Sequence, residues 1–264
     1  MSAPDLPPPP EHVITERPLH VHLHVSRVKS ETLAGGVVVV IDAIRASVTI
    51  AQAFRSGAKS VVPVLTGEDA KKRAAELVSR GVQKVLLGGE RGGLLIEGFD
   101  LDNSPFSYTQ ERVEGSTIVF TTSNGTAGLL HARHAAKIVV GSFSNLTTVC
   151  EALANEQRPV HILCCGTRDD VSLDDVLVGG AMAERLVSAG RQTSSDDSWS
   201  VAMALWKHVK AGGHAGIVRA MEESRGGRNM VKIGLARDVE FCSTMDTLPV
   251  LPVFDAATGL IQLA

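Results

Sequence analysis

The chain has 264 residues, of which 44% are hydrophobic and 21% charged, and this composition is typical of a globular protein with a packed core. Its formal net charge of −3 and its aromatic content of 4% provide neither a basic surface nor many platforms on which bases could stack. We therefore expect no nucleic-acid partner.

The N-terminal segment contains four consecutive prolines, Pro7–Pro10, which favour an extended chain. We predict a disordered, proline-rich lead-in over residues 1–18 and a single α/β domain over residues 19–264. The lead-in lacks the basic start and apolar core of a signal peptide, and Asp42 interrupts the apolar run around it. None of the four cysteines has zinc-site spacing. We expect a cytoplasmic protein with reduced thiols and no membrane partner.

The first predicted strand covers residues 20–25, where apolar and polar residues alternate. The alternation places His20, His22 and His24 on one face of that strand. Three imidazoles on one face can bind zinc, but the solvent-facing side of an edge strand is the more ordinary interpretation of this pattern.

Strands and helices then alternate along the chain. Residues 36–42 form a continuous β-branched run, which is typical of a central parallel strand covered on both faces. Further strands are predicted at residues 60–65, 84–89, 116–122, 137–142 and 159–166, and helices at residues 46–58, 67–81, 124–135, 145–155 and 172–190. This order predicts an α/β fold, a three-layer α/β/α sandwich with a mostly parallel sheet.

The C-terminal part begins with a predicted exposed linker at residues 191–198. Helices are predicted at residues 199–210 and 214–224, and short strands at residues 237–242 and 250–255. The apolar residues of the first of these helices would either form a homodimer or pack on the sheet, and the sequence leaves both open.

Polar clusters directly follow five of the predicted strands: residues 42–45, 89–93, 121–126, 141–142 and 165–167. In parallel α/β sheets the carboxyl ends of the strands form the crevice in which ligands bind. We therefore expect these clusters to converge on one edge of the sheet and to build a ligand site there.

Two of the clusters suit an anionic ligand. Residues 121–126 supply hydroxyl groups and free amides at a helix start, which favours negative charge, although a simple helix cap explains them equally well. Arg45 can fork onto a phosphate or sulfonate, or else only pair with Asp42. Glu90 and Arg91 lie between two glycine pairs, which let the backbone approach a ligand closely, or else the two form only a structural salt bridge.

Carboxylates in the same clusters suit a hard cation. Asp42, Glu90 and the pair Asp174 and Asp175 provide oxygen ligands, and Mg²⁺ takes a few carboxylates together with waters and phosphate oxygens. The alternative for Asp174 and Asp175 is a purely structural interaction with the dipole of their helix.

Several motifs in this order resemble one known family. They are VVVVIDAIRASVTI, GGERGG, IEGFDLDNSP, TTSNGT, VVGSFSN, SLDDVLVGG and GLARDVEFC, and the resemblance covers about residues 37–253. The chain is similar in these motifs to the 2-phosphosulfolactate phosphatases. It departs from them at Asp174, where the family usually has glutamate.

The resemblance implies a Mg²⁺-dependent phosphatase, a phosphoric monoester hydrolase that converts 2-phosphosulfolactate to 3-sulfolactate and phosphate. In some organisms this step belongs to coenzyme M biosynthesis. The substrate would be a small phosphorylated polyanion. A phosphatase of the same fold that acts on another phosphorylated hydroxy acid, and a noncatalytic protein that binds anionic metabolites, are the alternatives.

The resemblance also implies a set of site residues. The expected catalytic residues are Asp42, Arg45, Glu90 and Arg91, and the expected metal ligands are Asp42, Glu90 and Asp175. The expected substrate-binding residues are Gly92, Gly93, Asn103, Ser104, Thr122, Ser123, Asn124, Gly125 and Thr126. In this scheme Asn103 and Ser104 bind the sulfonate or carboxylate end. The nucleophile is water, or in the rival scheme Asp42 itself.

Overall fold

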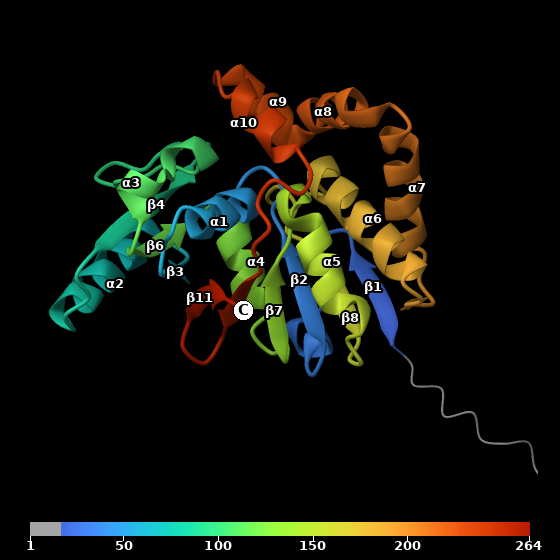
Figure 1. Cartoon of the computed structure of the whole chain (residues 1–264), viewed down its shortest axis with the longest axis horizontal. Coiled ribbons are helices and arrows are strands. Elements are labelled where there is room, and N and C mark those ends of the chain that lie inside the picture. The colour runs from blue at the N-terminus through green and yellow to red at the C-terminus, as the bar shows by residue number, and fades with distance from the viewer. Residues whose placement is uncertain (1–16) are drawn as a thin grey trace, which may run out of the picture.

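The computed structural model describes residues 17–264, so the predicted lead-in lies outside the described residues except for Arg17 and Pro18. The described residues form one eleven-stranded sheet with helices on both faces (Figure 1). The strands are β1 (Pro18–His22), β2 (Val37–Ile41), β3 (Ser60–Pro63), β4 (Val85–Arg91), β5 (Leu94–Leu95), β6 (Thr117–Thr121), β7 (Lys137–Val140), β8 (Val160–Cys164), β9 (Gln192–Thr193), β10 (Pro252–Asp255) and β11 (Leu260–Leu263). The predicted α/β fold is confirmed.

The helices cover the sheet in the expected order. They are α1 (Ala46–Arg55), α2 (Gly67–Ser79), α3 (Gln110–Val113), α4 (Gly125–His131), α5 (Leu146–Ala154), α6 (Leu173–Ser188), α7 (Ser198–Lys210), α8 (Gly213–Glu223), α9 (Arg225–Lys232) and α10 (Ala236–Cys242). None of these helices has the length and apolarity needed to cross a membrane, within residues 17–264.

Strand β2 shows why the fold has three layers. All five of its residues are buried, and they alternate between two hydrophobic cores. Val37, Val39 and Ile41 join the core under α5 and α6, whereas Val38 and Val40 join the core under α4. A strand buried on both faces needs no polar side, which explains its unbroken β-branched sequence.

The sheet consists of two parallel groups of strands that run in opposite directions. The strand order is β5-β4-β6-β3-β11-β10-β7-β2-β8-β1-β9. Strand β10 is antiparallel to β7, β11 to β10, and β3 to β11, so β3, β6 and β4 point opposite to β7, β2, β8 and β1. The β10–β11 hairpin lies between the two groups (Figure 1). The carboxyl ends of the two groups therefore do not lie along one edge of the sheet, which differs from the prediction.

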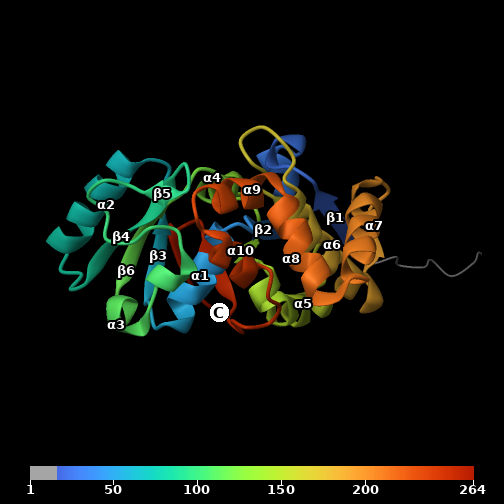
Figure 2. The ribbon, with the colours of Figure 1, turned by 90° about the horizontal axis from the view of Figure 1, so that it is seen from above.

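The C-terminal part differs most from the predicted elements. Residues 237–242, predicted as a strand, belong to helix α10, because Asp238, Val239 and Cys242 are buried together at helical spacing. Helix α9 and strand β11 are not among the predicted elements, and the predicted linker contains the short strand β9. Helices α8, α9 and α10 lie together above the ends of the central strands (Figures 1 and 2).

Helix α7 packs within the chain. Its residues Ala202, Met203 and Trp206 are buried in the same core as α6, and Trp206 Nε1 donates to Glu184 Oε2 at 2.8 Å. These apolar residues therefore pack inside the chain, which is one of the two alternatives predicted for this helix. The homodimer stays a prediction.

Strand β1 is flanked by β8 and the short β9, so it is not the sheet edge that its sequence suggests. His20 and His22 stack on His161 of β8, and burial lowers the pKa of His22 to about 4. His24 lies beyond the strand and faces the loop after β8 instead. All four cysteines are free thiols, as expected, and the structure shows that all four are buried.

Candidate active site

The described residues enclose a cavity of about 390 Å³ where the loops after β2, β4, β6 and β8 meet helix α9. Figure 2 shows α9 above the end of β2, with β4 and β5 to one side. The lining residues are Asp42, Ile44, Arg45, Glu90, Gly92, Gly93, Asn103, Ser123, Asn124, Thr167, Arg168, Gly226, Asn229, Met230, Lys232 and Ile233. Predicted site residues that follow strands of both parallel groups thus line the same cavity.

Asp42 and Glu90 form the acidic side of this cavity. Both are buried, and each follows or ends a parallel strand. The start of α4 lies against Asp42 because residue 125 is glycine: a Cβ there would lie 2.8 Å from Asp42 Oδ2. Glu90 accepts hydrogen bonds from Gly93 N at 2.7 Å and Ser123 N at 2.8 Å. Its carboxylate therefore ties the turn after β4 to the turn after β6.

Negative charge accumulates around Asp42. Burial, together with the nearby carboxylates of Asp174 and Glu90, raises the pKa of Asp42 to about 7. Burial and the charges of Asp174 and Asp42 also raise the pKa of Asp175 well above its ordinary value. A bound cation would relieve this repulsion, so the donor set suits a hard metal ion.

Asp175 lies outside the cavity lining. Its two carboxylate oxygens accept hydrogen bonds from Ala43 N and Gly166 N, both at 2.7 Å, and so join the ends of β2 and β8. Within residues 17–264, no three His, Cys, Asp or Glu side chains are grouped so that they could hold a metal ion. Of the three predicted metal ligands, the two that line the cavity are Asp42 and Glu90.

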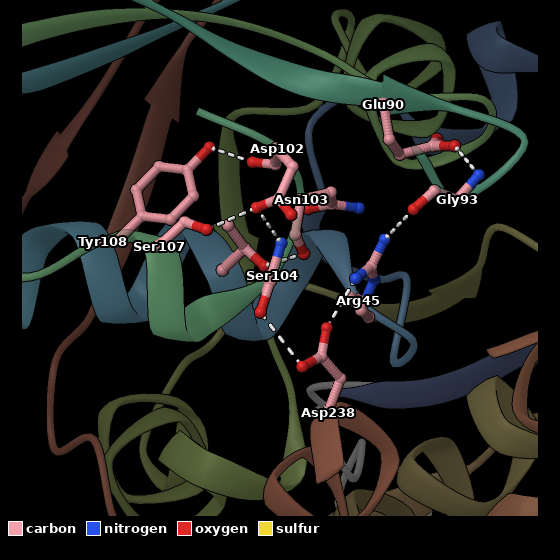
Figure 3. Close-up of polar contacts among 10 residues, drawn as sticks. Arg45, Glu90, Gly93, Asp102, Asn103, Ser104, Ser107, Tyr108 and Asp238 are labelled. Atoms are coloured by element: carbon pink, nitrogen blue, oxygen red, sulfur yellow. Dashed lines mark hydrogen bonds and ion pairs between the residues drawn. The ribbon is translucent and has the colours of Figure 1, made fainter. Parts of the chain in front are cut away.

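Arg45 is fully buried and held by two partners (Figure 3). Its Nη1 donates to Asp238 Oδ2 at 2.5 Å, and its Nη2 donates to the Gly93 carbonyl at 2.8 Å. Ser104 Oγ donates to the other Asp238 oxygen at 3.0 Å. Asp238, absent from the predicted site residues, therefore positions both Arg45 and Ser104. Arg45 lines the cavity, and Ser104 does not.

Arg91 is not among the residues that line the cavity. Its guanidinium donates to the Glu90 carbonyl at 2.7 Å and to Thr121 Oγ1 at 2.8 Å. The next two residues form the two-residue turn between β4 and β5, with φ of 64° at Gly92 and 85° at Gly93. Two consecutive positive φ angles are what this hairpin turn requires, which explains the glycine pair.

The sequence predicts that the cluster at residues 121–126 either binds an anion or serves only the start of the helix, and its residues divide between these two roles. Ser123 and Asn124 line the cavity. Thr122 and Thr126 instead bond to each other, with Thr126 N donating to Thr122 Oγ1 at 3.3 Å, which satisfies one free amide at the start of α4. The cluster at residues 141–142 also caps a helix, since Ser142 N donates to Asn145 Oδ1 at 2.9 Å.

Besides Thr167, which belongs to the predicted cluster at residues 165–167, three polar residues of the cavity are not among the predicted site residues: Arg168, Asn229 and Lys232. Arg168 directly follows the cluster at residues 165–167, so position in the chain is a signal that could have found it. The other two belong to α9, whose Gly-Gly start gives no helix signal.

Asn103 is the predicted residue whose environment most clearly points to a ligand. It is 3% exposed and lines the cavity, and its Oδ1 has no hydrogen-bond partner within residues 17–264. A buried acceptor without a donor costs free energy, so this atom suits a ligand or water that donates.

Comparison with known proteins identifies relatives along most of the chain. The family model described as 2-phosphosulpholactate phosphatase matches residues 22–257. A protein of Symbiobacterium thermophilum named probable 2-phosphosulfolactate phosphatase is 39% identical over 225 residues, which cover 85% of this chain and 94% of the relative. Proteins with the same name from Caldicellulosiruptor saccharolyticus and Clostridium perfringens are 36% and 33% identical, over 84% and 92% of this chain and 90% and 95% of the relatives.

Proposed function

The chain belongs to the 2-phosphosulfolactate phosphatase family of phosphoric monoester hydrolases, and we propose that it hydrolyses 2-phosphosulfolactate to 3-sulfolactate and phosphate with Mg²⁺ as cofactor. The observation that carries the proposal is a single cavity of small-molecule size that contains both buried carboxylates and cationic side chains. The carboxylates would hold the cation that binds the phosphate ester. The cationic side chains would bind the other anionic groups of the substrate.

Asp42 and Glu90 would hold the metal ion, because both line the cavity and Mg²⁺ commonly uses one or two carboxylates with waters and a substrate phosphate. When bound, Mg²⁺ would neutralise charge on the phosphoryl oxygens. In this proposal Asp175 supports the site indirectly, by fixing the backbone on both sides of Asp42.

The chain's own groups would position the reactants. Asn103 Oδ1 would accept a hydrogen bond from the attacking water and orient it. Arg45, held by Asp238 and Gly93, would contribute fixed positive charge without having to reorganise during the reaction. This scheme makes water, and not Asp42, the nucleophile.

The test is phosphate release from 2-phosphosulfolactate, measured with Mg²⁺ and with excess chelator, beside 2-phospholactate and an aryl phosphate. Metal-dependent turnover that prefers 2-phosphosulfolactate supports the proposal. Preference for 2-phospholactate would identify a phosphatase for another hydroxy acid. Binding of these anions without turnover would identify a noncatalytic metabolite-binding protein and contradict the proposal.

A further inference from the structure

We propose that Arg168 and Lys232 form a cationic clamp that binds the anionic groups of the substrate other than its phosphate, and so determine specificity. The inference rests on the proposed function and extends it to residues that the sequence motifs do not contain. With two cations for one sulfonate and one carboxylate, the clamp would match the substrate in charge.

The first argument is that the other cations near the cavity are already engaged. Arg45 is paired with Asp238, Arg225 with Asp170, and Arg91 donates to backbone carbonyls. By contrast, the side chains of Arg168 and Lys232 line the cavity and form no hydrogen bond or ion pair within residues 17–264. Their donors are therefore available to an anionic ligand.

The second argument is that the backbone of Arg168 is held in an unusual conformation. Its φ of 58° is in the left-handed region, which residues with side chains rarely adopt. Arg168 N donates to Asn124 Oδ1 at 3.0 Å, and His24 Nε2 donates to the Arg168 carbonyl at 3.0 Å. Such strain persists where surrounding contacts impose it, often at ligand sites. The contacts from Asn124 and His24 hold the backbone of Arg168 at the cavity.

The third argument concerns the placement of Lys232. Asn229 and Lys232 are three residues apart on α9 and both line the cavity, so one side of the helix faces the ligand. Met230 anchors the helix: a Cβ on Gly93 would lie 2.7 Å from Met230 Cε. Close contact with the turn between β4 and β5 fixes α9, and with it Lys232, at the cavity.

The clamp also supplies positive charge, which the predicted sulfonate or carboxylate site lacks. A sulfonate or carboxylate accepts hydrogen bonds and binds charged donors most strongly. Of the two residues predicted to bind that end, Ser104 donates to Asp238 and lies outside the cavity lining, and Asn103 is neutral. Arg168 and Lys232 add two charged donors.

The experiment compares Arg168→Gln, Lys232→Gln and the double variant with the unaltered protein in the presence of Mg²⁺. The substrates are 2-phosphosulfolactate, 2-phospholactate, which lacks the sulfonate, and isopropyl phosphate, which lacks both groups. Arg228→Gln is the matched control, since Arg228 is a cation of α9 outside the cavity lining.

Each single variant should lower kcat/KM for 2-phosphosulfolactate by about 10- to 100-fold, mainly through KM, because a charge-assisted hydrogen bond is lost. With isopropyl phosphate the change should stay below about twofold, because that ester has no group for the clamp to bind. 2-Phospholactate will show which cation serves the sulfonate. Equal losses on all three esters, or no loss on any, would overturn the clamp.

Titration calorimetry with 3-sulfolactate separates this inference from the proposed function. The clamp requires that the unaltered protein binds 3-sulfolactate and that each variant weakens the binding by about 10-fold or more, even if no ester is hydrolysed. Absence of turnover together with this binding pattern would contradict only the proposed function. Binding that is absent, or unchanged in the variants, would contradict the clamp.

Discussion

The two sides of the cavity are built differently. On the acidic side, the oxygens of Glu90 accept backbone N–H groups from two neighbouring turns, and Asp42 is crowded by the carboxylates of Asp174 and Glu90. On the basic side, Arg168 and Lys232 form no side-chain hydrogen bonds within the part of the chain that the structure describes. The acidic side is thus part of the scaffold, whereas the basic side is held mainly through its backbone. Substitutions in the scaffold of the acidic side should therefore change stability as well as activity, whereas substitutions on the basic side should change mainly substrate binding.

The largest effect on activity is expected for Asp42→Asn. Loss of a carboxylate that holds the metal ion should reduce kcat by about 1000-fold or more. The free energy of unfolding without metal should stay the same or rise, because one of several mutually repelling buried charges is removed. Phosphate release and thermal unfolding with and without Mg²⁺ measure both.

The metal itself gives the second readout for Asp42. Mg²⁺ should raise the Tm of the unaltered protein by binding only the folded state, and this shift should be much smaller in Asp42→Asn. Near-normal turnover of the variant, or an unchanged Mg²⁺ shift, would contradict the placement of the metal at Asp42.

This contrast also explains how far the sequence predicts the site. The β-branched run of β2 and the glycine pair at residues 92–93 carry local signals, so the acidic side is predictable. Helix α9 carries no such signal, because it starts Arg-Gly-Gly and is held by tertiary contacts such as those of Met230. The predicted strand at residues 237–242 is wrong because the partner that buries Asp238, Arg45, is distant in sequence.

The next effect is on stability and concerns Asp238. Asp238→Ala should lower the free energy of unfolding by about 3 to 5 kcal/mol, because it leaves the buried guanidinium of Arg45 without its charge partner. Urea unfolding measures the change. The double variant Arg45→Met with Asp238→Ala should recover part of the loss, since no unpaired charge remains.

Glu223→Ala is the matched control for Asp238→Ala. Glu223 also pairs with an arginine, Arg219, but the side chains of Glu223 and Arg219 are 62% and 80% exposed. An exposed ion pair contributes little to stability because water screens the charges, so the control should lose far less stability. Similar losses for the two variants would mean that the buried pair has no special structural role.

The smallest effect is expected for His24→Ala, which tests whether the basic side is preorganised through its backbone. Without the hydrogen bond from His24 Nε2 to the Arg168 carbonyl, Arg168 should leave the left-handed conformation part of the time. KM for 2-phosphosulfolactate should rise by about 3- to 10-fold, which corresponds to one hydrogen bond, while kcat changes little. Steady-state kinetics measures the changes in KM and kcat separately, and circular dichroism checks that the variant is folded.

His134→Ala serves as the control for His24→Ala, because His134 is exposed and lies outside the cavity lining. Isopropyl phosphate again separates the possible causes, since it has no group for Arg168 to bind. If His24→Ala raises KM equally for both esters, the histidine supports the whole cavity and not Arg168 in particular. A rise confined to 2-phosphosulfolactate, and absent when His24→Ala is added to Arg168→Gln, would show that His24 acts through Arg168.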